Sequence, residues 1–371
     1  MKLIVVHASC GAGHTKAAQA IYTFLTKRNQ AFDCKLVDVL ESSGGLFRYS
    51  YIYGYAALVL HAPFLWFLAF SLTQASLLHW FTRPIAIFLN RLQTRRFSDF
   101  LIRENPDFII STHFLSSEIA ASLKKSGKIK SRLLTVITDF GVHPFWISYP
   151  TDYYIVSSAF TKRQLLNQRI EEEHIKDIGI PVDEKFYAVY QRNDIAQKLN
   201  LEYDKFTVLI MTGSFGTGPL EEIACALEPF VQVIVVCARN DQLYRRLKAR
   251  GLSNVRIYGF VDNIHELMAV SDVMITKPGG LSISEALAME LIPVFISAIP
   301  GQEIANIEAL KESGVGMYFK EVATIKEAVL DLKSHPEKLA SMKEDIQLVK
   351  KPDTLEGIYD VICKSSPGAG S

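Results

Sequence analysis

Short apolar runs alternate with helical patterns along almost the whole chain, and this alternation limits the possible folds most strongly. The apolar runs cover residues 2–8, 33–39, 107–111, 133–138 and 153–157, and then 206–212, 231–237, 254–258, 272–276 and 293–297. Helical patterns lie between them, for example at 221–227, 241–248, 282–288 and 303–312. Strands that alternate with helices form parallel sheets, because each strand is reached through a crossover connection. The sequence therefore predicts an α/β fold.

The chain has 371 residues, which is enough for two domains that each bury a core. A polar, charged stretch at 190–204 separates the two series of strands and is the predicted linker. We expect two doubly wound, Rossmann-like domains, at 1–190 and 191–350, facing a cleft with ligands at the carboxyl ends of their strands. A helix near 354–363, within 351–364, is expected to pack back on the first domain. The tail at 365–371 is expected to be disordered.

Composition excludes several other classes of protein. Apolar residues make up 49% of the chain and the net charge is +1, which indicates neither a disordered chain nor a nucleic-acid partner. The apolar run after Lys2 ends at Ala8, which is too short for the h-region of a signal peptide. The cysteines form no C-x-x-C pair, which is typical of reduced thiols in the cytosol rather than of disulfides or a zinc site. They are Cys10, Cys34, Cys225, Cys237 and Cys363.

The segment 42–98 interrupts the alternation. It contains no Asp or Glu but holds several arginines and many aromatic residues. Such a composition suits the headgroup region of an anionic bilayer, and we expect an interfacial insertion here. The residues predicted to contact lipid are Trp66, Phe67, Arg91, Arg95 and Arg96. The alternatives are an insertion whose aromatic rings pack in a core or an oligomer contact, and a spanning helix at 55–72, which His61 and Pro63 disfavour.

A glycine loop, Cys10-Gly11-Ala12-Gly13-His14, follows the first predicted strand and opens a helix. Glycines at this position let a ligand approach backbone N–H groups at the helix N-terminus. As a dinucleotide-binding fingerprint, with Asp38 on the ribose, the loop is incomplete because Lys16 stands in place of the third glycine. His14 lies at a strand end, where an imidazole can take a proton from a hydroxyl group. The alternative is that His14 binds substrate or caps the helix.

A second glycine motif occupies residues 276–286, again between a strand and a helix. Lys277, Gly279 and Gly280 place a cation and bare amides at a helix start, which suits a diphosphate. Glu285 is expected on the first turn of that helix, where its carboxylate can accept two ribose hydroxyl groups.

A third motif, at 300–306, also opens a predicted helix. Gln302 and Glu303 present a donor and acceptors side by side, as neighbouring sugar hydroxyl groups require. Two polar, glycine-containing helix starts at successive strand ends favour a binding site over a packing role.

Taken together, these motifs resemble glycosyltransferase family 28, in the branch of plant monogalactosyldiacylglycerol synthases and bacterial processive diacylglycerol glucosyltransferases. The resemblance rests on Gly-Ala-Gly-His at 11–14, Thr-Asp-Phe-Gly-Val-His-Pro-Phe-Trp at 138–146, Thr-Lys-Pro-Gly-Gly at 276–280 and Pro-Gly-Gln-Glu at 300–303. The last two are specific, whereas the glycine loop is not, and Ala12 stands where the family often has Gly or Asn. The resemblance implies a GT-B fold, with the acceptor in the N-terminal domain and the UDP-sugar in the C-terminal one.

The resemblance also implies roles for individual residues. His14 matches the family's proposed catalytic base. The residues matched to the acceptor side are Gly11, Gly13, Asp139, His143 and Trp146. The residues matched to the donor site are Gly213, Ser214, Arg239, Asn240, Phe260, Val261, Lys277, Gly279, Gly280, Ser282, Glu285, Gln302, Glu303 and Asn306. Of these, Phe260 and Val261 match the uracil-binding loop.

The implied reaction is an inverting transfer of glucose or galactose from a UDP-sugar to diacylglycerol or a glycosyldiacylglycerol, by a peripheral protein at the cytoplasmic face of the membrane. No Asp-x-Asp motif occurs in the chain, so we expect neither a metal clamp nor a cofactor, and helix amides and Lys277 would stabilise the leaving diphosphate. We expect no nucleic-acid partner.

Other functions stay open at this point. An N-acetylglucosaminyltransferase acting on undecaprenyl-linked muropeptide shares the implied fold and the glycine loop. A regulatory sensor of UDP-sugars would be expected to lose His14 or Glu303, and both are present. A dinucleotide oxidoreductase would leave the motifs of the second half without a role. The sequence does not distinguish glucose from galactose, or the number of sugars added, or the oligomeric state.

Overall fold

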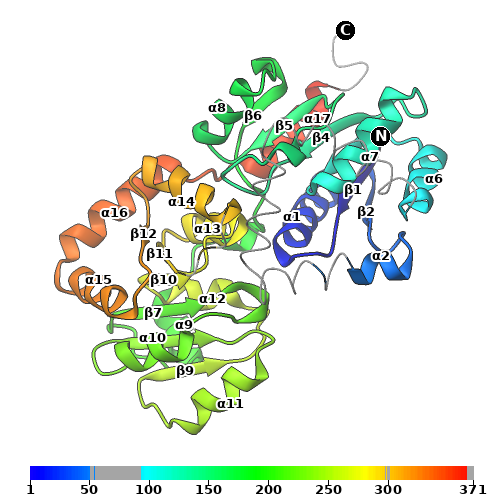
Figure 1. Ribbon diagram of the computed structural model, residues 1–371. Helices are drawn as coiled ribbons and strands as arrows, with labels where there is room; N and C mark the ends of the chain where they lie inside the picture. The colour runs from blue at the N-terminus through cyan, green and yellow to red at the C-terminus, as the bar shows by residue number, and fades with distance from the viewer. Residues whose placement is uncertain (51–53, 55–92, 297, 299–300, 366–371) are drawn as a thin grey trace. The chain divides into compact units, whose positions relative to one another are not determined.

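The protein forms two compact units. The computed structural model describes residues 1–50, 54, 93–296, 298 and 301–365 (Figure 1). Unit 1 comprises Met1–Asp183, Ile299–Ala305 and Lys351–Ser371, and unit 2 comprises Glu184–Ala298 and Asn306–Lys350.

Unit 1 is built on a six-stranded parallel sheet. Its strands are β1 (Lys2–His7), β2 (Asp33–Asp38), β3 (Phe108–Ser111), β4 (Arg132–Val136), β5 (Tyr153–Val156) and β6 (Ile175–Asp177), in the spatial order β2-β1-β3-β4-β5-β6. The chain reverses its direction of strand addition beside β1. In doubly wound sheets, the carboxyl ends of the two strands beside such a reversal are where ligands bind, here β1 and β3.

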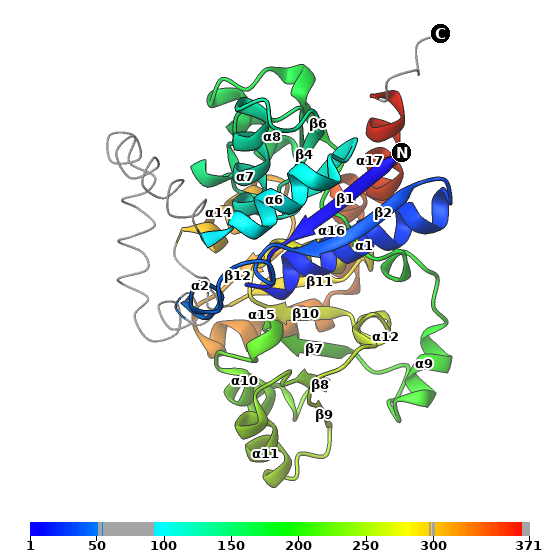
Figure 2. The same cartoon turned by 90° about the vertical axis from the view of Figure 1, so that its right-hand side faces the viewer.

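Helices cover both faces of this sheet (Figure 2). Leu3 and Val5 of β1 share a core cluster with α1 (Ala12–Arg28) and α17 (Thr354–Lys364). Ile4 and Val6, which point the other way, share a cluster with α6 (Arg95–Glu104) and α7 (Phe114–Lys125). Since β1 is buried on both faces, its sequence is a continuous apolar run rather than an alternating one.

The shorter elements of unit 1 lie mainly in the connections. They are α2 (Gly45–Tyr49), the 3-10 helix η2 (Pro144–Trp146), α8 (Ala159–Asn167) and the 3-10 helix η3 (Glu172–His174).

The helix predicted near 354–363 is α17, and it belongs to unit 1. The red ribbon of α17 lies among elements from the first half of the chain (Figure 1). Thr354 Oγ1 donates to the carbonyl oxygen of Ile178 at 2.6 Å. Gly357 permits a close approach, because a Cβ at this position would lie 3.0 Å from Cδ1 of Ile178.

Unit 2 repeats the architecture with a second six-stranded parallel sheet. Its strands are β7 (Thr207–Met211), β8 (Gln232–Val236), β9 (Val255–Tyr258), β10 (Val273–Thr276), β11 (Ile292–Phe295) and β12 (Met317–Tyr318), in the order β12-β11-β10-β7-β8-β9. Its helical elements are η4 (Glu184–Phe186), α9 (Arg192–Lys198), η5 (Gly213–Phe215), α10 (Leu220–Leu227), α11 (Asp241–Ala249), α12 (Ile264–Ala269), α13 (Gly280–Ala288), α14 (Gln302–Glu312), α15 (Val322–Ser334) and α16 (Pro336–Val349). The first residues of α14 group with unit 1.

The doubly wound α/β fold predicted from the sequence is confirmed. The ten predicted strands are present, whereas the short edge strands β6 and β12 were not predicted. The stretch 190–204, expected to be a linker, instead contains α9. It is part of unit 2, because the guanidinium of Arg192 pairs with the carboxylate of Asp272 at 2.8 Å.

Candidate active site

His14 lies on the first turn of α1, directly after the carboxyl end of β1. Gly11 is the N-cap residue of α1, and no side chain in the described part of the protein caps this helix. The first turn also contains no acidic residue. The amides at the start of α1 are therefore suited to a polar oxygen or a negative charge. His14 itself is partly exposed, at the strand end where the sequence predicts it.

Two neighbours hold the imidazole of His14 by its Nδ1 atom. Nδ1 lies 2.9 Å from the carbonyl oxygen of Thr112, just after β3, and 2.8 Å from Oγ1 of Thr138, just after β4. Thr112 also donates from Oγ1 to the carbonyl oxygen of His14 at 2.9 Å. A carbonyl oxygen can only accept, so Nδ1 carries the proton in the neutral imidazole. Nε2 is therefore the basic atom of His14.

The surroundings of His14 favour its neutral form. Burial lowers the pKa of His14 below the ordinary histidine value, while the carboxylate of Asp139 and the bond to Thr112 act in the opposite direction. Asp139 follows Thr138 and is buried. A lowered pKa keeps the imidazole unprotonated near pH 7, as a general base requires, and the negative charge of Asp139 stabilises the imidazolium once a proton has been taken.

The loop after β4 carries two more residues that were matched to the acceptor side. His143 caps η2, because its Nδ1 accepts from the backbone N–H of Phe145 at 3.2 Å. Trp146 was expected to face lipid headgroups, but only 3% of its surface is exposed. Its ring packs in a core cluster, 6.0 Å from the imidazole of His14. The ring of Trp146 therefore packs beside His14 in the interior of unit 1 and is not available to lipid headgroups.

A buried histidine at the end of the neighbouring strand β3 was not predicted from the sequence. His113 directly follows Thr112 and is the N-cap residue of α7. The rings of His113 and His14 lie 4.7 Å apart at an angle of 81°. The position after the apolar run at 107–111, in Ser-Thr-His-Phe, is the sequence signal that could have indicated it.

Asp38, the ribose ligand in the dinucleotide interpretation, has a different role. Its Oδ1 accepts from the backbone N–H groups of Ser9 at 3.3 Å and Leu40 at 2.9 Å. The carboxylate therefore holds the loop after β1 in place, which removes the main support for a dinucleotide site.

In unit 2, a glycine-rich loop follows β7. Gly213 and Gly216 have φ angles of 70° and 54°. A Cβ on Gly216 would lie 2.2 Å from the carbonyl oxygen of Cys237, so this position requires glycine. Asn240 fixes the loop, because its Nδ2 donates to the carbonyl oxygen of Gly216 at 2.9 Å while its Oδ1 caps α11. Asn240, matched to the nucleotide site, thus also has a structural role.

Three other residues matched to the nucleotide lie at the ends of β8 and β9. Arg239 is exposed, and its backbone N–H donates to the carbonyl oxygen of Ser214 at 3.3 Å. Phe260 follows β9 with 62% of its surface exposed, and Val261 is partly buried beside it. An exposed aromatic ring at a strand end offers a flat apolar surface to a nucleotide base.

Lys277 connects two neighbouring strand ends of unit 2. It follows β10, which pairs with β7, and its Nζ donates to Oγ1 of Thr217 in the glycine-rich loop at 2.6 Å. Gly279 is the N-cap residue of α13, and within the described residues no side chain caps this helix. A cation and the amides of a helix start therefore converge here, as a diphosphate requires. Thr217 was not predicted from the sequence.

Two other residues of this motif differ from expectation. Glu285 was expected on the first turn of α13, but that helix begins at Gly280, so Glu285 lies on the second turn, with 3% of its surface exposed. Asn306 has no exposed surface, and its Nδ2 donates to the carbonyl oxygen of Pro278 at 2.9 Å. Its side chain therefore supports the Lys277–Gly279 loop, whereas Ser282, on the first turn of α13, is partly exposed.

The remaining predicted residues are placed only in part. Glu303 is partly exposed on the first turn of α14, and Arg95 and Arg96 are exposed at the start of α6. Trp66, Phe67 and Arg91, together with the side chain of Gln302, lie outside what the structure describes. No helix among the described residues has the length and apolar character needed to cross a membrane.

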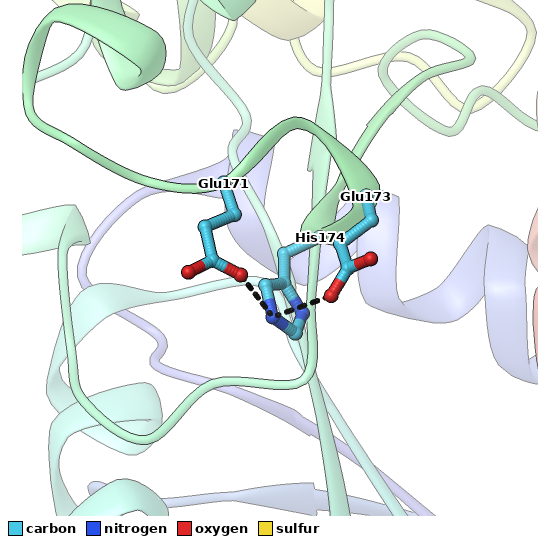
Figure 3. Close-up of side chains that lie close together, drawn as sticks. All are labelled: Glu171, Glu173 and His174. Atoms are coloured by element: carbon cyan, nitrogen blue, oxygen red, sulfur yellow. Dashed lines mark ion pairs between the residues drawn. The ribbon is translucent and has the colours of Figure 1, made fainter.

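A group of metal-type side chains lies elsewhere in unit 1. Glu171, Glu173 and His174 bring their carboxylates and imidazole together on the connection through η3 (Figure 3). Nε2 of His174 lies 3.8 Å from each carboxylate, and both glutamates are exposed. This connection precedes β6, so it is at the amino-terminal edge of the sheet, opposite the edge that carries His14. The group is an exposed ion-pair cluster rather than part of the candidate active site.

Comparisons with known proteins agree with this geometry. Residues 14–182 match the family model described as monogalactosyldiacylglycerol (MGDG) synthase, and residues 207–358 match the glycosyltransferase family 28 C-terminal domain. A processive diacylglycerol beta-glucosyltransferase of Bacillus cytotoxicus is 30% identical over 292 residues, covering 77% of this chain and 75% of the relative. A protein of the same description from Bacillus mycoides is 30% identical over 288 residues, covering 76% and 74%.

Solved structures extend the similarity to the whole fold. MurG of Acinetobacter baumannii superposes with a TM-score of 0.58 at 15% identity, covering 98% of this chain and 99% of that one. Anabaena HepE in complex with UDP gives 0.59 at 16% identity, with the same coverage. These similarities identify the fold as GT-B. With relatives at 30% identity over three quarters of its length, the chain belongs to glycosyltransferase family 28, in the branch of the monogalactosyldiacylglycerol synthases and the processive diacylglycerol glucosyltransferases.

Proposed function

We propose that this protein transfers a hexose from a UDP-sugar to the hydroxyl group of diacylglycerol or of a glycosyldiacylglycerol, with inversion and with His14 as the general base. The observation that carries the proposal is the arrangement of His14. Its Nδ1 is held by the carbonyl oxygen of Thr112, so that Nε2 is left as the basic atom at the carboxyl end of β1.

The reaction is a single displacement. Nε2 of His14 takes the proton of the acceptor hydroxyl, the acceptor oxygen forms a bond to the anomeric carbon, and the bond between that carbon and the diphosphate oxygen breaks. UDP leaves with the electron pair. Asp139 stabilises the imidazolium by its negative charge, since its carboxylate favours the protonated form of His14.

The donor binds to unit 2. Lys277 and the amides at the start of α13 supply positive charge for the diphosphate as it leaves, which is the role a metal ion has in other glycosyltransferases. Phe260 offers its exposed ring to the uracil base. We therefore expect turnover without an added divalent cation.

The names of the relatives support the choice of lipid and sugar. They are described as processive diacylglycerol beta-glucosyltransferases, which favours glucose over galactose and an acceptor that can itself be a glycosylated diacylglycerol. Because such an acceptor lies in a bilayer, we place the protein at the cytoplasmic surface of the membrane as a peripheral protein.

The test is thin-layer chromatography of lipid products formed from radiolabelled UDP-glucose or UDP-galactose on vesicles that contain diacylglycerol, with EDTA in a parallel reaction. We expect glucolipids, formed equally with EDTA. His14→Ala should lower turnover by roughly 10² to 10⁴, the usual contribution of a positioned base, while UDP binding measured by calorimetry is kept. Near-normal turnover of His14→Ala would exclude His14 as the base, and the absence of any labelled lipid with both donors would refute the proposed function.

A further inference from the structure

His113 is a buried titratable group with no part in the reaction described above. Its Nδ1 accepts from the backbone N–H of Leu115 at 3.1 Å, which caps α7. Because that lone pair is engaged, the neutral ring carries its proton on Nε2. Nε2 lies 3.2 Å from Sγ of Cys10, so His113 donates to the cysteine. Burial and the nearby imidazoles of His14 and His7 hold the pKa of His113 well below its usual range, which keeps the ring uncharged.

Cys10 belongs to the glycine loop that ends in His14. Burial raises the pKa of the Cys10 thiol to about 12, so the sulfur is a thiol and not a thiolate. A neutral thiol beside a neutral imidazole is not the ion pair that a cysteine nucleophile requires. The contact between Cys10 and His113 therefore joins the loop after β1 to the start of α7 by a hydrogen bond.

The ring of His113 also forms one wall around the base. It meets the imidazole of His14 edge to face, with centroids 4.7 Å apart. Trp146 lies 6.0 Å from the same imidazole. Thr112, between β3 and His113 in the chain, accepts from Nδ1 of His14 through its carbonyl oxygen. The segment Thr112–His113 thus acts on His14 in three ways. Thr112 fixes its tautomer, while His113 contacts its ring and is bonded to Cys10 in the glycine loop that precedes it.

We propose that His113 is a positioning residue for the general base: through its bond to Cys10 and its edge-to-face contact it holds His14 in the orientation in which Nε2 can take the acceptor proton. This inference rests on the proposed role of His14. His113 does not touch the reacting atoms and donates no proton to them. Displacement of a catalytic group by about 1 Å can cost roughly 100-fold in rate, so a contact of this kind can be measured in turnover.

The test compares variants that remove different parts of the arrangement. His113→Asn keeps an acceptor for the cap of α7 but removes the ring and the bond to Cys10, and should lower kcat by roughly 10- to 100-fold with the KM for UDP-glucose unchanged. Cys10→Ala removes the hydrogen bond and the packing of Sγ against the core cluster of Ile4 and Val6, but keeps the His113 ring, and should lower kcat by roughly 2- to 10-fold. Ser158→Ala is the matched control, because it removes the side-chain cap of α8 at another strand end of the same sheet.

The pH profile of kcat/KM separates a positioning role of His113 from a general loss of stability. The titratable groups that act on His14 are Asp139, His7 and His113, and Cys10 contacts His113 rather than His14. Removing the His113 ring admits water to His14, so its pKa should rise toward the ordinary value and the acid limb of kcat/KM should move to higher pH. Ser158→Ala should leave that limb in place.

Each outcome decides the inference. Lower kcat with a shifted acid limb in His113→Asn, and an intermediate loss in Cys10→Ala, supports it. Unchanged kcat in both variants, or a loss without any shift of the limb, overturns it. If His113→Asn does not fold, as thermal melting would show, Cys10→Ala alone decides, since it leaves the cap of α7 intact. His14→Ala is measured in parallel: if that variant is active, the proposed base has failed, whereas an inactive His14→Ala with fully active His113→Asn refutes only the positioning role.

Discussion

Asn306 offers a sharp test of how unit 2 holds its donor. The family resemblance matches Asn306 to the donor site, but in the structure its Nδ2 donates to the carbonyl oxygen of Pro278, and the side chain is fully buried. In Asn306→Ala the carbonyl oxygen loses this partner in the interior, which costs about 1–3 kcal/mol. If the loop that carries Lys277 binds the diphosphate only when held in this way, the Kd for UDP should rise by roughly 5- to 150-fold.

The assay is isothermal titration of UDP and of UDP-glucose into Asn306→Ala. A supporting role weakens both ligands by the same factor, because the diphosphate site is affected in each case. A sugar contact weakens UDP-glucose and leaves UDP unchanged. Asn254→Ala is the control: Asn254 Nδ2 donates to the carbonyl oxygen of Glu228 in the same unit, at the amino-terminal end of β9, and its loss should not affect UDP. Unchanged UDP affinity in Asn306→Ala, with a lower melting temperature, would refute the reasoning.

Three further predictions concern other parts of the site. Because the pKa of His14 is lowered and its neutral form is the proposed base, kcat/KM should stay high as pH falls to the ordinary histidine range and decline below it. Asp139→Asn removes the charge that favours the imidazolium, so the acid limb of kcat/KM should move to still lower pH while kcat drops. An acid limb that moves to higher pH would contradict this sign. Phe260→Ala should weaken UDP binding by about 1–3 kcal/mol in calorimetry, because stacking on the uracil base is lost, whereas Phe260→Trp should retain the affinity. Equal affinities of Phe260→Ala and the unaltered protein for UDP would exclude a contact between Phe260 and the base. Replacing Arg95 and Arg96 by Gln should reduce cosedimentation with phosphatidylglycerol vesicles at low salt, at about 1 kcal/mol per charge, without changing UDP binding; an unchanged preference for anionic over neutral vesicles would refute the electrostatic part.

Most strands were predicted because they are buried on both faces. A strand such as β8 (Gln232–Val236) is apolar at nearly every position, so its sequence alone identifies it. The strands β6 and β12 are only three and two residues long and lie at sheet edges, where one neighbour suffices and no apolar run is needed. The other two edge strands, β2 and β9, are six and four residues long and were predicted, so it is the shortness of β6 and β12 that hides them from sequence patterns.

The site was predicted less completely than the fold. His14 stands in a recognisable loop, but the atoms that fix its tautomer come from Thr112 and Thr138, 98 and 124 residues further along the chain. No local pattern connects them, because they meet only through the order of β1, β3 and β4 in the sheet. Trp146 was misjudged for a related reason, since an aromatic residue in a loop has the same local sequence whether its ring is buried or exposed.

The position of α17 in the core of unit 1 determines the order in which the protein can fold during synthesis. Leu355, Ile358 and Ile362 of this helix are buried against β1 and α1, and each contributes about 1.5–3 kcal/mol of apolar burial. The ribosome makes these residues only after the whole of unit 2. Unit 2 can therefore fold while the part of the first sheet that α17 covers, beside α1, is still exposed to water.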